Sequence, residues 1–141
     1  MANTVMTSFK KELMEGTHDL ATSGDTFKLA LYTSSSSINS AATTIYTVSD
    51  EVANSGTYAA GGGTLAGQTV TTDGTTAICN FTDLEFTSAT ITARYALIYN
   101  SSESTAAVCV LDFSTDETST AGTFKIDFPA SGASTSIIRV A

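Results

Sequence analysis

Apolar and polar residues alternate with a period of two along most of the chain after residue 20. The clearest stretch spans residues 26–33, which place Phe27, Leu29 and Leu31 on one side of an extended chain and more polar neighbours on the other. This alternation predicts a half-buried β-strand. We expect further strands at residues 45–48, 64–72, 75–81, 90–99, 106–113, 123–128 and 136–140.

Turn-forming residues separate these predicted strands. Asp73-Gly74 lies between two of them and predicts a tight hairpin. Residues 61–63 are three consecutive glycines, which predict a flexible turn; no Lys follows them, so they do not match a phosphate-binding loop. Polar loops are expected at 34–43 and 114–121. Many short strands with frequent turns predict an all-β fold, either an antiparallel β-sandwich or a jelly-roll-like domain.

The first segment follows a different period. Val5, Phe9 and Leu13 recur every four residues, and Gly16 stands where a helix commonly ends. This spacing predicts a short amphipathic α-helix over residues 4–15. A helix of that length is not stable alone in water, so its apolar stripe must dock on a partner or cover an open end of the β domain. We therefore divide the chain into an N-terminal helix and connector, 1–20, and a single β-sandwich domain, 21–141.

Composition favours a structural or binding role. Roughly a third of the residues are Ser or Thr, far above the usage of an average globular domain. The hydrophobic fraction is 42%, and many of the other residues are small, which predicts a thin core. Thin-cored chains commonly gain stability by assembling with copies or partners.

The charge balance argues against two classes of partner. The chain carries 14 acidic and 6 basic residues and a formal net charge of −8, so it repels nucleic acid. No apolar run has the length of a membrane span, and the N-terminus lacks the apolar core of a signal peptide. We expect synthesis in a cytoplasm, with no nucleic-acid or membrane partner.

The two cysteines, Cys79 and Cys109, fall on apolar strand faces and are expected to be free, buried thiols. Their spacing fits no zinc motif. A disulfide between them is the alternative.

Residues capable of catalysis are scarce. His18 is the single histidine, and we expect a packing or capping role for it rather than general-base chemistry. Calcium binding by loop carboxylates is the less favoured interpretation of the acidic clusters, and solvated loops the favoured one. We predict a protein that is not an enzyme and binds no metal or cofactor. The acidic clusters comprise Asp50, Glu51, Asp83, Glu85, Asp112, Asp116 and Glu117.

Aromatic residues give a further candidate contact. Tyr95 and Tyr99 lie on one predicted strand and share a face. The chain has no Trp, so we interpret these tyrosines as cross-strand packing or interface residues rather than a sugar-binding platform. The candidate partner-binding residues are Val5, Phe9, Leu13, Tyr95 and Tyr99.

A series of short phrases, in order along almost the whole chain, resembles small structural virion proteins of tailed bacteriophages. Each phrase is a common β-strand sequence, and the order of the phrases carries the resemblance. The phrases are Phe9-Lys10-Lys11-Glu12-Leu13 with Gly16 and His18, residues 26–32, Glu51-Val52, Tyr58 with the glycine run, Phe81-Thr82-Asp83, residues 88–94, residues 96–100, Leu111-Asp112-Phe113 and residues 123–126.

The resemblance implies a non-enzymatic structural protein, most often a decoration or cement protein that stabilises the capsid. The implied partners are the major capsid protein and further copies of the chain, as a homotrimer, on the capsid surface of the virion. A tail, neck or baseplate component is the first alternative. A host-surface adhesin that binds glycans through loops 34–43 and 114–121 is the second.

Overall fold

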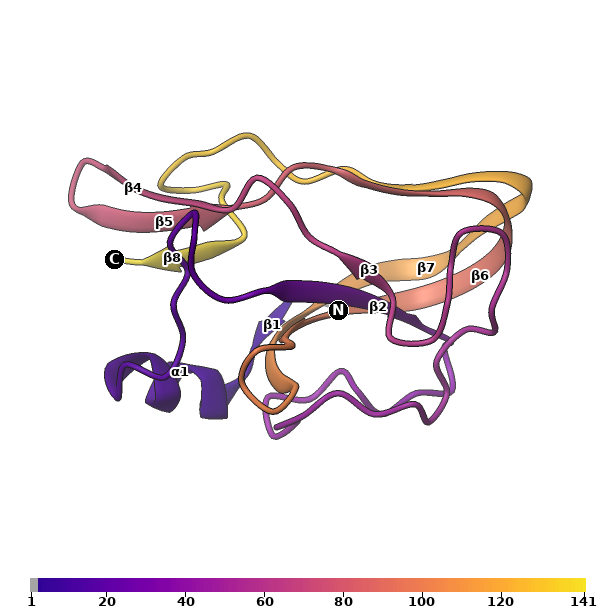
Figure 1. Cartoon of the computed structure of the whole chain (residues 1–141), viewed down its shortest axis with the longest axis horizontal. Coiled ribbons are helices and arrows are strands. Elements are labelled where there is room, and N and C mark those ends of the chain that lie inside the picture. The colour runs from indigo at the N-terminus through magenta and orange to yellow at the C-terminus, as the bar shows by residue number, and fades with distance from the viewer. Residues whose placement is uncertain (1–2) are drawn as a thin grey trace.

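The computed structural model describes residues 3–141 and shows a mostly β molecule with two antiparallel sheets and one short helix (Figure 1). The prediction of an all-β sandwich with a short helix is confirmed. The larger sheet has the strand order β1 (Thr4–Val5), β7 (Ala106–Ile126), β6 (Leu84–Asn100), β2 (Phe27–Tyr32) and β3 (Gly63–Thr64). The smaller sheet has the order β4 (Thr69–Asp73), β5 (Thr76–Asn80) and β8 (Ile138–Val140).

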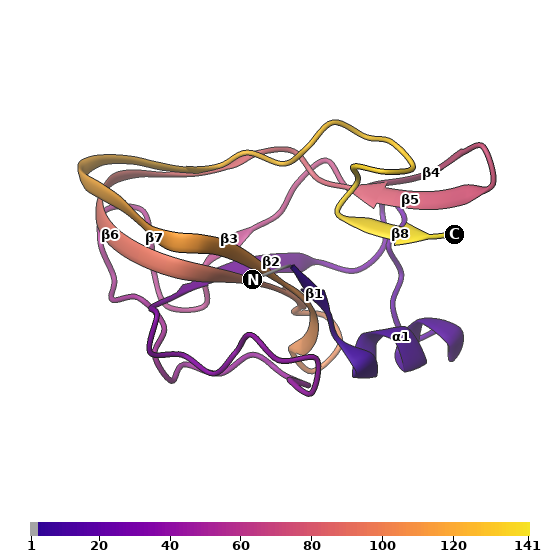
Figure 2. The same cartoon turned by 180° about the vertical axis from the view of Figure 1, so that it is seen from behind.

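One long hairpin, β6–β7, contributes to both layers. Figures 1 and 2 show the two strands running together along one layer, curving over at one end and returning in the other layer. The register between them shifts on either side of Ala89, which pairs with Gly122, and Ser88 and Ala121 have positive φ angles of 51° and 47°. Bulges of this kind increase the local bend of a strand pair. The irregular backbone therefore lets a single hairpin fold back on itself.

The predicted loop at 114–121 is wrong. These residues lie inside β7, which continues without a break to Ile126, and Thr118 pairs with Thr92 of β6. A run of Ser, Thr and acidic residues was interpreted as a loop because it is polar. Thr is nevertheless a favourable strand residue, and the ladder to β6 satisfies the backbone of a strand whose side chains face solvent.

The predicted helix begins too early. The helix α1 spans Thr7–Met14, whereas Val5 belongs to β1 and pairs with Cys109 of β7. The backbone N–H of Met6 also donates to the Val108 carbonyl. The β-branched pair Thr4–Val5 thus completes a sheet edge, which is a better match to its propensity than a helical turn.

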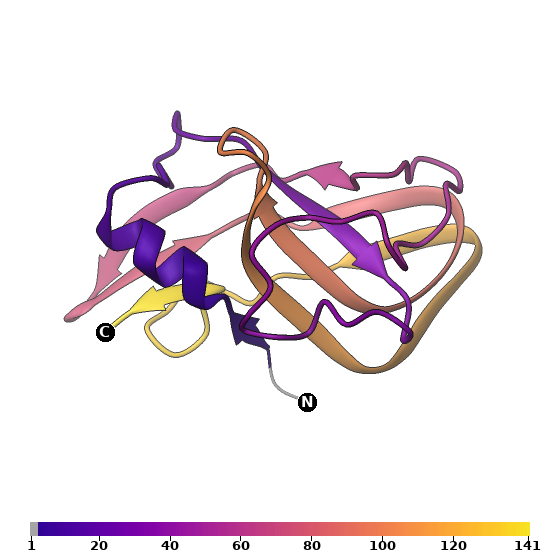
Figure 3. The same ribbon diagram turned by 90° about the horizontal axis from the view of Figure 1, so that it is seen from below.

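Strand β2 is confirmed, but it is buried on both faces rather than on one. Ala30 and Tyr32, on the side predicted to be more polar, are fully buried. Figure 3 shows why: the segment 33–62 crosses the outer face of the larger sheet. The strand predicted at 45–48 is reduced to a single bridge between Ile45 and Ala106.

The strand predicted at 64–72 is divided in two, with β3 ending at Thr64 and β4 starting at Thr69. The hairpin at Asp73-Gly74 is confirmed, since Asp73 pairs with Thr76 across it. The turn at the glycine run is confirmed as well. A Cβ on Gly62 would lie 1.8 Å from the Leu29 carbonyl oxygen, so this close approach of two backbones requires glycine.

Candidate functional site

Four of the five tyrosines gather around one carboxylate, that of Glu51. The hydroxyls of Tyr46 and Tyr58 donate to its two oxygens, at 2.6 and 2.7 Å, and the backbone N–H of Gly61 donates at 2.7 Å. Tyr46 stacks on Tyr99, with ring centroids 4.8 Å apart. Each of these donors lies on the segment 33–62, so the carboxylate holds that segment together over the larger sheet.

The same cluster changes the acidity of its tyrosines. Burial raises the pKa of Tyr32, Tyr46, Tyr58 and Tyr99 above the ordinary value of 10.0, and the negative charge of Glu51 raises each of them further. The phenols therefore remain neutral donors well beyond neutral pH. The arrangement explains Glu51 as an internal acceptor with its oxygens engaged, which is the role of a structural carboxylate.

The single histidine fastens α1 to the larger sheet. The His18 side chain is fully buried, and its Nε2 lies 2.7 Å from Glu12 Oε2. Its Nδ1 lies 2.9 Å from Nδ2 of Asn100, which also donates to Asp25 at 2.7 Å. Because an amide nitrogen can only donate, Nδ1 accepts and the Nε2 proton is directed at Glu12. The ring also packs on Phe9, with centroids 4.9 Å apart, so the expected packing role is confirmed.

The acidic clusters do not converge within residues 3–141: no group of three or more His, Cys, Asp or Glu side chains there is placed to hold a metal ion. Asp83 instead pairs with Lys125, at 3.2 Å, and accepts from the Phe128 backbone N–H, which holds the Asp83 pKa below its usual value. Asp116 pairs with Arg94 at 2.9 Å. These carboxylates serve as strand-to-strand contacts. Over the same residues, no helix combines the length and hydropathy needed to cross a bilayer.

The two cysteines are buried free thiols, as predicted. Burial raises the pKa of the Cys79 thiol to about 11 and that of the Cys109 thiol to about 12. Both groups are therefore protonated at neutral pH and behave as small apolar side chains.

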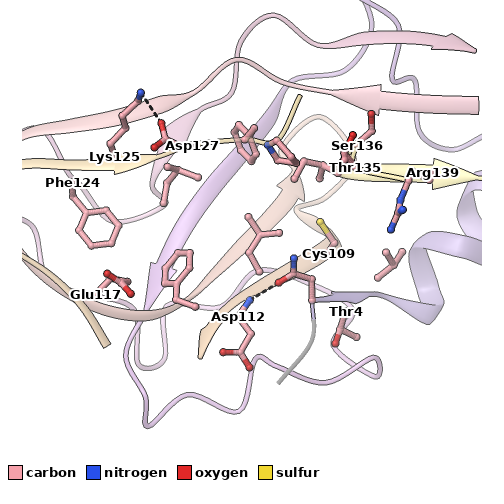
Figure 4. A pocket seen from close by; sticks show the side chains of 18 of the residues that line it. Thr4, Cys109, Asp112, Glu117, Phe124, Lys125, Asp127, Thr135, Ser136 and Arg139 are labelled. Carbon is pink, nitrogen blue, oxygen red and sulfur yellow. Dashed lines mark hydrogen bonds and ion pairs between the residues drawn. The ribbon is translucent and has the colours of Figure 1, made fainter. Parts of the chain in front are cut away.

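An open groove of about 600 Å³ lies between the two layers along β7 (Figure 4). Phe113 and Phe124 come from the two halves of the folded β7, and their ring centroids lie 6.4 Å apart across the groove. Charged groups line its rim: Lys125 contacts Asp127 at 2.6 Å, and Arg139 reaches toward the groove from β8. The wall is thus mixed, with buried Phe124 and half-buried Phe113 beside charged side chains.

A second groove, of about 160 Å³, separates α1 from the smaller sheet. Among the described residues no charged side chain lines it, and two of the residues that line it, Val70 and Val140, are each 52% exposed; Met14, which follows the lining residue Leu13 in α1, is 86% exposed. We call this region the apolar end; its members are Leu13, Met14, Leu20, Val70, Ala77, Ile78, Cys79, Ile138 and Val140.

The predicted partner-binding residues separate on folding. Phe9 and Tyr99 are buried, and Tyr95 is half-buried opposite Tyr32. Val5 lines the groove between the layers, and Leu13 lines the apolar end. The apolar stripe Val5, Phe9 and Leu13 therefore packs largely against the β domain. Only its last member, Leu13, reaches an exposed apolar surface.

Sequence reasoning missed Met14, Val70 and Val140 as a surface. The three lie far apart in the sequence, near the beginning, in the middle and at the end of the chain. Only the placement of α1 beside β4 and β8 brings them together. The one available signal was Val70 in a run of threonines, which marks an apolar position on an otherwise polar strand.

Comparison with protein-family models finds no match, and comparisons with curated proteins and with solved structures find no significant match.

Proposed function

We propose that the chain is a non-enzymatic structural protein of a tailed-bacteriophage virion, a decoration protein that binds the outer capsid lattice in many copies. The observation that carries the proposal is the apolar end, an uncharged groove lined by the exposed Val70 and Val140, with the exposed Met14 next in sequence to the lining residue Leu13, on a chain of net charge −8. A monomer rarely leaves its large apolar side chains grouped in this way unless a partner covers them.

The interior of the molecule supports the same role. The groups best suited to chemistry, His18 and Glu51, are both engaged in holding segments of the chain together. The acidic exterior keeps the protein soluble, and the apolar end supplies a contact to the major capsid protein. Each contact is small, but repetition over a lattice gives avidity, and binding only the assembled lattice stabilises it by mass action.

The test is binding to capsids assembled without this protein. The purified chain should sediment with empty capsids, at a copy number comparable with that of the major capsid protein, and should raise their melting temperature. A copy number far below that level on native particles would contradict decoration and favour a tail, neck or baseplate position. Retention on host cells with no binding to capsids would favour the adhesin alternative.

Matched surface variants test whether the apolar end is the contact. The double variant Met14→Gln/Val140→Gln should lose capsid binding. Its control, Ile45→Gln/Val48→Gln, changes two other exposed apolar residues, 55% and 66% exposed, and should bind normally. Equal capsid binding by the two variants would contradict the proposal that the apolar end is the contact. Deleting the N-terminal segment is a poorer test, because Met6 and Phe9 belong to the core and the deletion would unfold the domain.

A further inference from the structure

Two of the strand edges in these sheets differ in character, the outer edge of β7 and the outer edge of β4. Within residues 3–141, the outer edge of β7 pairs with β1 at Val110 and Cys109 and forms a bridge to Ile45 at Ala106, whereas β4 is paired only with β5. A bare edge offers unpaired backbone N–H and C=O groups to any other strand. Natural proteins block such edges with charges, bulges, short strands or covering segments.

The edge of β7 is blocked in these ways. Beyond Val110 it carries Asp112, Asp116 and Glu117, and its pairing with β6 is interrupted by register shifts. Ser114 and Ala121 have positive φ angles, so the strand is not straight there. Acidic charge and irregular backbone together disfavour the addition of another strand.

The edge of β4 has almost none of this protection. Its five residues, Thr69–Asp73, are all exposed, and its pairing with β5 runs in unbroken register. Asp73 is its only charged residue, at one end. Val70, 52% exposed, connects the edge to the apolar end. The strand is regularly paired with β5, uncharged along its first four residues and adjacent to uncovered apolar surface.

We propose that β4 is a self-association edge, at which a second copy of this chain adds its own β4 antiparallel about a two-fold axis. Only one register pairs all five residues, with Thr71 opposite its own counterpart, Val70 opposite Thr72 and Thr69 opposite Asp73. The two smaller sheets then form one six-stranded sheet. A two-fold contact of this kind is the commonest symmetry of soluble oligomers.

Charge favours a second copy as the occupant. Two chains of net charge −8 repel one another over most of their surfaces, and 64–82, the stretch around β4, contains one charged residue, Asp73. In the two-fold register the two Asp73 side chains lie at opposite ends of the strand pair, about 14 Å apart along it, each beside a neutral threonine. The contact thus brings together the parts of two acidic molecules that repel least.

The same register joins the apolar surfaces. Residues directly opposite in an antiparallel pair share a face, so Val70 and Thr72 of both copies lie on one side of the combined sheet. Val70 pairs with Cys79, and Cys79 with Ile138, which places the apolar end of each copy on that same side. A strand pair about 17 Å long is small for an interface, so we expect a dissociation constant in the micromolar range or weaker.

Sedimentation over a concentration series tests the proposal with a matched pair of variants. The wild-type chain should shift from monomer to dimer. Thr71→Lys places two like charges opposite each other and should raise the dimer dissociation constant about tenfold or more. Thr118→Lys makes the same change at an exposed threonine on the blocked edge of β7, and it should leave the dissociation constant unchanged.

A charge swap then tests the register. Thr71→Glu alone should also weaken the dimer, whereas mixing it with Thr71→Lys should restore association because the two charges then face each other. A wild-type chain that stays monomeric at every concentration, equal effects of the Thr71 and Thr118 variants, or no recovery on mixing would overturn the proposal. So would a trimer, the state that the phage resemblance predicts. None of these results depends on binding to a capsid, so the proposed function is tested separately.

Discussion

Two apolar surfaces of this molecule, the outer face of the larger sheet and the end of the smaller sheet beside α1, are treated in opposite ways. Over the larger sheet, the segment 33–62 is held down by a carboxylate and a set of tyrosines, and residues such as Ala30 and Tyr32 are fully buried beneath it. Over the smaller sheet, α1 leaves an uncharged groove with Val70 and Val140 half exposed. The chain covers the larger sheet with its own segment and internal hydrogen bonds, but it leaves the apolar end uncovered. We therefore expect a contact with another molecule at the apolar end.

The largest expected effect comes from opening the closed face. Glu51→Ala removes the acceptor of three donors and leaves buried phenols unsatisfied, so the free energy of unfolding should fall by about 2–4 kcal/mol. Chemical denaturation measures this loss. Glu51→Gln, which keeps one acceptor oxygen, should cost less than Glu51→Ala. Asp50→Asn, at the neighbouring exposed acid, is the control and should change stability little. A similar loss in both positions would show that Glu51 has no special role.

Next in size is the attachment of α1, which forms one wall of the apolar end. His18→Ala removes a fully buried ring with contacts to Glu12 and Asn100 and should cost about 2–3 kcal/mol. Helix amides should exchange with solvent faster in this variant than amides of β6. Thr17→Ala changes the adjacent residue and should be nearly neutral. Unchanged exchange in α1 would mean that His18 does not fasten the helix.

These two regions also show what sequence can predict. The alternation at 26–33 and the Asp73-Gly74 turn predicted β2 and the β4–β5 hairpin, because both are local signals. The course of β7 through 114–121 was missed because the ladder to β6, and not apolar periodicity, makes those residues a strand. The apolar end could not be predicted at all. Its residues are separated by more than a hundred positions, and only the tertiary fold brings Leu13 beside Val140.

Alkaline pH should act on the closed face. The pKa values of Tyr46 and Tyr58 are raised in the folded state, mainly by burial, relative to 10.0 in an exposed tyrosine. The contribution of these two tyrosines to the free energy of unfolding is complete below pH 10. It is lost as the pH rises from 10 toward their pKa values in the folded state, because over that range the unfolded chain releases the tyrosine protons and the folded chain does not. Tyrosinate absorbance should appear together with unfolding. Ionisation of all five tyrosines near pH 10 without unfolding would contradict the cluster.

The smallest effect on stability is expected at the open edge. Thr71→Lys, at an exposed position of β4, should change the free energy of unfolding of the monomer by less than about 0.5 kcal/mol, as surface substitutions usually do. Thermal melts at low protein concentration measure this. A large loss would mean that the variant disturbs the fold, and its effect on association would then have to be read from Thr69→Lys at the end of the same strand.

Hydrogen exchange of the wild-type chain at low and high protein concentration tests the central claim most directly. The account predicts that amides of β4 exchange more slowly as concentration rises, while amides of β7 beyond Val110 exchange at the same rate throughout. Protection that rises on β7 instead, or that rises on neither edge while the protein sediments as a larger species, would contradict it.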